Sequence, residues 1–83
     1  MDLVKVFGLN VKKAREAKLL TQEDLEGLTG LRRSYISELE GGKRNPSIRA
    51  LQRLAEALGV LPANLLQLPP STRWPPHTGD DGR

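Results

Sequence analysis

The residue types that could do chemistry in this chain gather between positions 32 and 45. Two arginines and two serines come first and a basic turn follows them: Arg32, Arg33, Ser34 and Ser37, then Lys43, Arg44 and Asn45. A guanidinium can donate two parallel hydrogen bonds to phosphate oxygens or to the O6 and N7 atoms of guanine. The pattern therefore favours binding of a phosphate-rich partner over covalent chemistry.

Positive charge is concentrated in the same part of the chain. Residues 1–31 hold five basic and five acidic side chains, whereas residues 32–53 hold six basic and two acidic ones, a net charge of +4. Contacts to phosphates supply much of the affinity of DNA binding, so this placement favours a DNA-facing surface. A basic stretch on its own is weak evidence, because such a stretch is usually an ordinary solvated face.

Catalytic and metal-binding chemistry is not expected. The chain has no cysteine and a single histidine, His77, so it offers no thiolate nucleophile, no Cys/His metal cluster and no base for its serines. Gly41-Gly42-Lys43 lacks the spacing of a P-loop and follows a helical pattern instead of a strand. We therefore expect no enzyme activity, no cofactor and no metal.

The expected location is the cytoplasm, at the nucleoid if the chain binds DNA, and no contact with a membrane is expected. No stretch approaches the ~18 consecutive apolar residues that a membrane span needs. Asp2 also stands where a secretory signal would be basic.

The spacing of apolar residues predicts one all-α domain over residues 1–68. Apolar positions recur every three or four residues, and no segment alternates as a half-buried strand would. Five helices are predicted, over residues 3–18, 22–29, 32–40, 48–58 and 62–68, with N-caps at Thr21 and Ser47 and stops at Gly30, Gly59 and Pro69-Pro70. The expected inward positions are Leu3, Phe7, Val11, Ala14, Leu25, Leu28, Ile36, Leu39, Ile48, Leu51, Leu54, Ala55 and Leu58.

Residues 69–83 have the composition of a disordered or polyproline-like tail. They carry four of the six prolines and a single large apolar side chain, Trp74. Trp74 stands between two proline pairs. It is either a solvent-exposed aromatic residue in a flexible end or the anchor of a segment that docks on another protein.

Helices 22–29 and 32–40 are joined by a tight connection that contains Gly30, which is typical of a helix-turn-helix unit whose second helix lies in the major groove of DNA. The chain resembles the Xre/Cro, or lambda-repressor-like, helix-turn-helix family from about residue 7 to residue 68. The matches in one register are Gln22, Gly30, Ile36, Ser37, Glu40, Asn45-Pro46 and Gly59. The length and the segment 33–37 look most like the small controller proteins of restriction–modification systems. The resemblance implies a compact five-helix DNA-binding domain.

The resemblance also implies which side chains contact DNA. Gln22 would contact a phosphate, or else is an exposed residue of a first helical turn. Arg33, Ser34 and Ser37 would contact base edges or the adjacent backbone, with Arg33 as the main reader of sequence, because a bidentate contact to guanine discriminates strongly. Arg32 stands where the family often has a capping serine or threonine, and it would contact phosphate or solvent.

Further contacts are expected around the end of the third helix. Tyr35 is either a partly buried packing ring or a DNA contact. Glu38 is better explained as a solvated or arginine-orienting residue than as an acceptor from cytosine, because phosphates repel a carboxylate. Lys43, Arg44 and Asn45 would form a phosphate clamp, with Arg44 also able to reach the groove, or else they make an ordinary basic turn.

Some implied roles are structural. Arg15 and Glu40 match positions that form a partly buried ion pair, so loss of DNA binding in an Arg15→Ala variant would not place Arg15 on DNA. The chain departs from the family at Glu26, where alanine is usual, and at Leu19, where glycine is usual. Glu26 must reach solvent, pair with a neighbouring arginine or push the helices apart. Gly27 weakens the second helix by about 0.5–1 kcal/mol relative to alanine.

One helix-turn-helix unit reads only a few base pairs, so the expected function is that of a homodimeric transcriptional regulator. The operator would be palindromic, with half-sites about 34 Å apart as in helix-turn-helix dimers generally. The expected dimer interface is the fifth helix together with the end of the fourth, with the leucines Leu61, Leu65, Leu66 and Leu68. The alternative is that all four leucines belong to the core.

The competing interpretation is a protein-interaction module, such as an antitoxin-like protein that binds a partner. A helix-turn-helix scaffold can serve this purpose. Arg32, Arg33 and Ser34 together favour DNA, because an interaction module has no need of groove-reading side chains beside a phosphate clamp.

Overall fold

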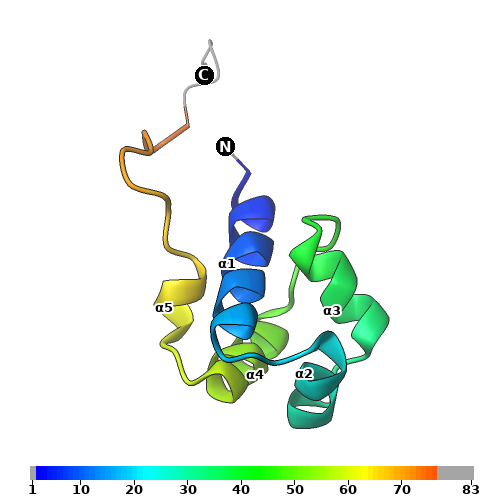
Figure 1. Ribbon diagram of the computed structural model, residues 1–83. Coiled ribbons are helices and arrows are strands. Elements are labelled where there is room, and N and C mark those ends of the chain that lie inside the picture. The colour runs from blue at the N-terminus through cyan, green and yellow to red at the C-terminus, as the bar shows by residue number, and fades with distance from the viewer. Residues whose placement is uncertain (1, 77–83) are drawn as a thin grey trace.

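The structure, a computed structural model that describes residues 2–76, has five α-helices over those residues (Figure 1). They are α1 (Leu3–Ala17), α2 (Gln22–Thr29), α3 (Arg33–Glu40), α4 (Ile48–Leu58) and α5 (Pro62–Leu65). α1 runs between α5 and α3 and contacts both, and α4 packs against α1, α2 and α5. The all-α prediction is confirmed, and no helix within residues 2–76 is long and apolar enough to span a membrane.

Local sequence signals set the helix ends. Thr21 and Asp24 form a capping box, in which each side chain accepts a hydrogen bond of 2.9 Å from the other residue's backbone N–H. The Ser47 hydroxyl accepts from the backbone N–H of Ala50 at 3.0 Å and caps α4. Gly30 and Gly59 end α2 and α4 with φ of 77° and 68°, a conformation that favours glycine. These predicted caps and stops are confirmed.

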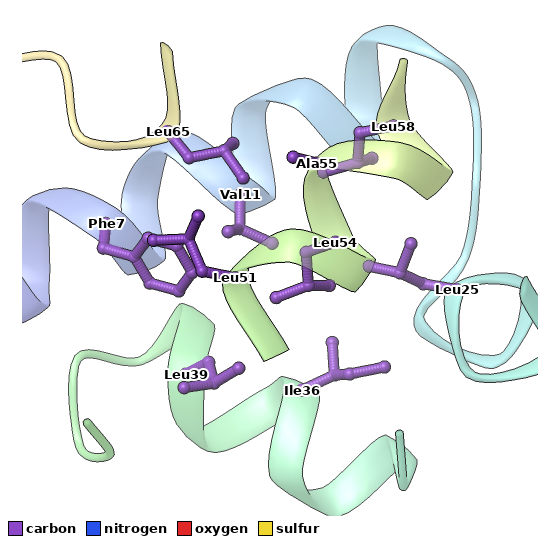
Figure 2. Close-up of a cluster of buried hydrophobic side chains, with 10 residues drawn as sticks. All are labelled: Phe7, Val11, Leu25, Ile36, Leu39, Leu51, Leu54, Ala55, Leu58 and Leu65. Carbon is purple, nitrogen blue, oxygen red and sulfur yellow. The ribbon is translucent and has the colours of Figure 1, made fainter. Parts of the chain in front are cut away.

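The core lies where all five helices meet. Figure 2 shows side chains from each of them pointing toward one another. Its members are Phe7, Val11, Leu25, Ile36, Leu39, Leu51, Leu54, Ala55, Leu58 and Leu65. Burial of this cluster fixes α3 against α1 and α2, so the second helix of the helix-turn-helix unit presents only its remaining faces to solvent.

Three predicted inward positions are wrong. Leu3, Leu28 and Ile48 are 39%, 60% and 81% exposed. Leu28 is exposed because the inward stripe of the short α2 runs through Leu25 and Thr29, four residues apart. Thr29 is tolerated there because its hydroxyl donates to the Leu25 carbonyl at 2.7 Å and accepts from the Leu31 backbone N–H at 3.1 Å.

Ile48 and Leu3 stand at the first positions of their helices, before the helix reaches the core. The buried stripe of α4 begins two residues later, at Ala50 and Leu51. A periodic pattern read from sequence continues to the helix end, whereas the packed contact does not. Three boundaries also differ: α1 ends at Ala17, α3 begins at Arg33 with Arg32 as its N-cap, and α5 ends at Leu65.

Gly8 allows α1 and α3 to approach very closely. A Cβ atom at this position would overlap the carbonyl oxygen of Leu39 in α3. Only glycine has no side chain to place there, so the backbone of α3 rests directly on α1. The hydrophobic pattern does not reveal this contact, which sets how closely α3 packs against α1.

The C-terminal segment is tied back to α1. The Asn10 amide donates to the carbonyl oxygens of Leu65 at 3.0 Å and Gln67 at 2.9 Å. Residues 69–76 then run helix-free past the N-terminal end of α1, with one turn closed by a 3.1 Å hydrogen bond from Thr72 N–H to the Pro69 carbonyl (Figure 1). The predicted disorder of residues 77–83 lies outside the described residues.

Trp74 lies against its own domain. Together with Leu3, Leu66 and Leu68 it lines a surface cavity of about 190 Å³. The ring is 58% exposed, so it covers this apolar surface only in part.

Candidate nucleic-acid interface

The exposed face of α3 carries the polar residues that the sequence singled out. Arg33, Ser34 and Ser37 are exposed, whereas Ile36 and Leu39 on the opposite face are fully buried. The helix is therefore held by one face and free on the other. This is the geometry that a helix needs to enter a groove of DNA.

The start of α3 is capped from α2. Arg32, at the N-cap position, makes no side-chain capping hydrogen bond. The carboxylate of Glu26 accepts a hydrogen bond of 3.1 Å from the backbone N–H of Arg33 instead. One expected outcome was that Glu26 pairs with a neighbouring arginine. Glu26 does contact Arg33, but through its backbone N–H and not through its guanidinium. A carboxylate here also faces the positive end of the α3 dipole.

The Arg33 guanidinium lies beside a second α2 carboxylate. Its Nη1 is 3.6 Å from Oε2 of Glu23, and the two side chains are 59% and 72% exposed. The two glutamates of α2, three positions apart, therefore face one residue of α3, Glu26 at its backbone and Glu23 at its side chain. The sequence analysis predicted no contact between Glu23 and Arg33, and the i, i+3 spacing of Glu23 and Glu26 was the signal that could have found it.

Arg44 is folded back from the loop after α3 onto the helix surface. Its Nη1 donates to Oε1 of Glu38 at 2.9 Å, and its guanidinium carbon stands 5.1 Å from the centre of the Tyr35 ring. Glu38 is an arginine-orienting residue, as expected. Tyr35 is half-buried and packs on the core, and its ring face supports the arginine.

Arg15 and Glu40 form the ion pair that the resemblance implied. Nε and Nη2 of Arg15 donate to the two carboxylate oxygens at 2.7 and 2.9 Å, and Nη1 donates to the Leu20 carbonyl at 2.8 Å. The side chains are only 12% and 4% exposed. The hydrogen bond to Glu40 raises the pKa of Arg15, against the smaller effect of burial. The pair ties α1 to the end of α3.

Gln22 belongs to the same network. Its amide donates to Oε1 of Glu40 at 3.1 Å, so its side chain is held in place at the start of α2. Gln22 and Arg33 line one open surface cleft of about 360 Å³ between the end of α1 and the first turns of α2 and α3. The structure thereby brings together a predicted phosphate contact and the predicted base reader.

The remaining predicted contacts surround this surface. Arg32, Lys43 and Asn45 are exposed, and within residues 2–76 neither Arg32 nor Lys43 has a carboxylate partner. Asn45 lies at the end of the loop beside Pro46, where it also lines an apolar cavity under α1 and α4. The described residues include no group of His, Cys, Asp or Glu side chains that could hold a metal ion.

One residue of the expected dimer interface is misplaced. Leu65 is 1% exposed and belongs to the core, because α5 needs one side chain to anchor it on α1 and α4. Leu61 and Leu66 are 68% and 36% exposed, and Leu68 is half-buried beside Trp74. Of the four leucines of the expected interface, three therefore offer surface to a partner: Leu61, Leu66 and Leu68.

Comparison with known proteins matches residues 11–65 to the helix-turn-helix family model. An uncharacterised HTH-type transcriptional regulator, y4dJ, of Sinorhizobium fredii is 47% identical over 60 residues, which cover 72% of this chain and 78% of the relative. The restriction–modification controller protein C.AhdI from Aeromonas hydrophila, which has a high-resolution crystal structure, shares 42% sequence identity with this chain. The two structures align with a TM-score of 0.72 over 75% of this chain and 94% of that one.

A second solved neighbour is the restriction–modification controller protein C.Esp1396I, as a tetramer in complex with its natural 35 base-pair operator. It is 34% identical, with a TM-score of 0.71 over 78% of this chain and 86% of that one. The resemblance inferred from the sequence is thereby confirmed in both its parts, the family and the similarity to controller proteins. Two short helices on a shared core, the polar face of α3 and the family match over residues 11–65 identify this chain as a member of the helix-turn-helix family.

Proposed function

We propose that this protein is a sequence-specific regulator of transcription that binds double-stranded DNA with α3 in the major groove. The observation that carries this proposal is the arrangement of charge on α3. Arg33 projects from its first turn, and Arg44 is brought back onto the same helix by Glu38 and Tyr35. Two guanidinium groups therefore lie on the exposed side of α3, and the opposite face of α3 is buried in the core.

The other polar groups fit contacts to the DNA backbone. Lys43 and Arg32 flank the two ends of α3, and Gln22 is fixed at the start of α2 by Glu40. In a major-groove complex these positions face the phosphates on either side of the groove. Ser34 and Ser37 stand between them on the exposed face and are assigned to base edges or the adjacent backbone. Asn45 completes the clamp after α3.

The protein acts as a homodimer on a palindromic operator. A single α3 covers only a few base pairs, and a two-fold pair doubles the contact and requires half-sites about 34 Å apart. The interface is assigned to Leu61, Leu66 and Leu68, the leucines after α4 that retain exposed surface. The similarity to restriction–modification controllers, one of them solved as a tetramer on its operator, supports this assembly and a controller role.

Such a protein performs no catalysis and works in the cytoplasm, at the nucleoid, because that is where its operator lies. These assignments follow from the DNA-binding role and are supported by membership of the helix-turn-helix family.

A binding selection from randomised DNA duplexes at near-physiological salt tests the proposal. The expected result is an enriched palindrome with two short half-sites one helical turn apart. Retention of all duplexes alike, abolished by salt and without enrichment, would contradict sequence-specific binding. That outcome would turn the search to a protein partner for the same scaffold.

A further inference from the structure

The cationic side chains around α3 fall into two classes. Arg33 and Arg44 each have a carboxylate partner, Glu23 at 3.6 Å and Glu38 at 2.9 Å. Within the described residues, Arg32 and Lys43 have none. All four side chains belong to exposed residues on the same surface, so burial does not account for the difference.

A carboxylate partner changes what an arginine can gain from DNA. A phosphate offers the guanidinium the same interaction that the carboxylate already supplies, so exchanging one for the other gains little. Guanine offers two acceptors in one plane, O6 and N7, which only a correctly placed base pair presents. An arginine held by a carboxylate therefore gains most from the right base.

The geometry of each pair fits this role. Both ion pairs are about half exposed or more, with side-chain exposures of 59% and 72% for Arg33 and Glu23 and 55% and 48% for Arg44 and Glu38. Each pair occupies only Nη1 of the guanidinium, so the Nε and Nη2 donors are free for a base edge while the pair is kept. Tyr35 also keeps the Arg44 guanidinium over α3.

We propose that Glu23 and Glu38 are positioning residues that determine specificity: a non-specific phosphate contact of Arg33 or Arg44 must break the ion pair, whereas a contact to the correct base keeps it. By the same argument, Arg32 and Lys43, which have no carboxylate partner among residues 2–76, supply sequence-independent affinity. This inference rests on the proposed DNA-binding function. The two glutamates weaken binding to DNA that lacks the correct base. They therefore raise specificity by disfavouring the competing DNA.

The test compares Glu23→Gln and Glu38→Gln with the wild type on two duplexes, the operator obtained by selection and a scrambled duplex of equal length. Glutamine keeps the size of the side chain and removes its charge. Glu56→Gln is the matched control, because Glu56 is an exposed glutamate of α4. Among the described residues its carboxylate accepts a hydrogen bond only from Gln52 and has no cationic partner.

We expect each test variant to bind the scrambled duplex about two- to five-fold more tightly, the range that exposed ion pairs span, and the operator with a smaller gain. The ratio of the dissociation constant for scrambled DNA to that for the operator therefore falls in both variants and stays unchanged in Glu56→Gln. Combining Glu23→Gln with Arg33→Ala removes the gain on scrambled DNA, because the released guanidinium is gone. A merely structural role for Glu23 would not produce this dependence.

An unchanged or increased ratio in Glu23→Gln and Glu38→Gln, in variants whose circular dichroism matches the wild type, would overturn the inference and leave the proposed function standing. An equal fall in Glu56→Gln would also overturn it, because net charge alone would then explain the effect. If the wild-type protein itself binds both duplexes alike, the proposed function fails and the inference fails with it.

Discussion

The Oε2 atom of Glu26 lies 3.1 Å from the backbone nitrogen of Arg33, so a side chain of α2 caps the helix that carries the candidate base reader. The chain departs from its family at Glu26 and at Arg32, the residue before Arg33. Glutamate replaces the usual alanine in α2, and Arg32 occupies the N-cap position without capping α3. The two departures compensate each other, because one supplies the acceptor that the other lacks.

Glu26→Ala should therefore destabilise the protein by about 1 kcal/mol, the usual cost of losing a helix cap. A serine introduced by Arg32→Ser supplies a local cap, so the double variant should regain most of this loss. Thermal unfolding of the parent, both single variants and the double variant measures the coupling. Additive effects of the two substitutions would contradict the compensation.

Leu19 offers a site for stabilisation. It adopts a φ of 59° directly after α1 and is 89% exposed, so its side chain contributes strain and little packing. Leu19→Gly should raise the free energy of unfolding by about 1 kcal/mol. Leu19→Ala is the control, because alanine keeps the unfavourable Cβ atom. Equal unfolding midpoints for the glycine and alanine variants would show that the backbone is not strained there.

The capping box at α2 makes stability depend on pH. The backbone and hydroxyl hydrogen bonds from Thr21 lower the pKa of Asp24 below its ordinary value of 3.8. A carboxylate with a lowered pKa in the folded state stabilises the protein above the pKa of the unfolded chain, and this contribution disappears as the pH falls through the folded-state pKa.

Asp24→Asn should accordingly lower the unfolding temperature at neutral pH, and the difference from the parent should vanish in strong acid. Unfolding curves recorded across the acid range measure this. A difference that persists unchanged in strong acid would mean that Asp24 acts through something other than its charge.

The dimer assignment predicts opposite results for neighbouring leucines. Leu61→Glu places a charge on exposed surface and should halve the mass measured by sedimentation while the fold is kept. Leu65→Glu places a charge in the core and should unfold the protein. A folded Leu61→Glu variant with the parent's mass would remove Leu61 from the interface.

Sequence reasoning succeeded where the determinant is local. The N-caps at Thr21 and Ser47 and the helix stops at Gly30 and Gly59 depend on neighbours within a few residues, and all were predicted. Helix orientation was less accessible. Leu28 is exposed because the inward stripe of α2 runs through Leu25 and Thr29, and Ile48 is exposed because α4 begins before it reaches the core.

The candidate site shows the same division. The Arg15–Glu40 pair was accessible only through the family resemblance, because the two residues are 25 positions apart. The pairing of Arg33 with Glu23 depends on the angle between α2 and α3, and the placement of Arg44 depends on the path of the loop after α3. The Asn10 contact to Leu65 spans 55 positions and has no local signal.

The central claim is that α3 reads DNA sequence through Arg33. It is tested most directly by measuring the affinity of Arg33→Ala for the selected operator and for a panel of operators with one base pair changed per half-site. Lys43→Ala serves as the comparison. Loss of a phosphate contact should weaken binding to all duplexes similarly and reduce the slope of log K against log salt concentration by about one.

Arg33→Ala should cost about 1–3 kcal/mol on the operator and remove the preference at a single position of each half-site, with the other positions discriminated as before. An equal loss on every duplex of the panel, with all preferences intact, would contradict the account, because Arg33 would then be one more phosphate contact.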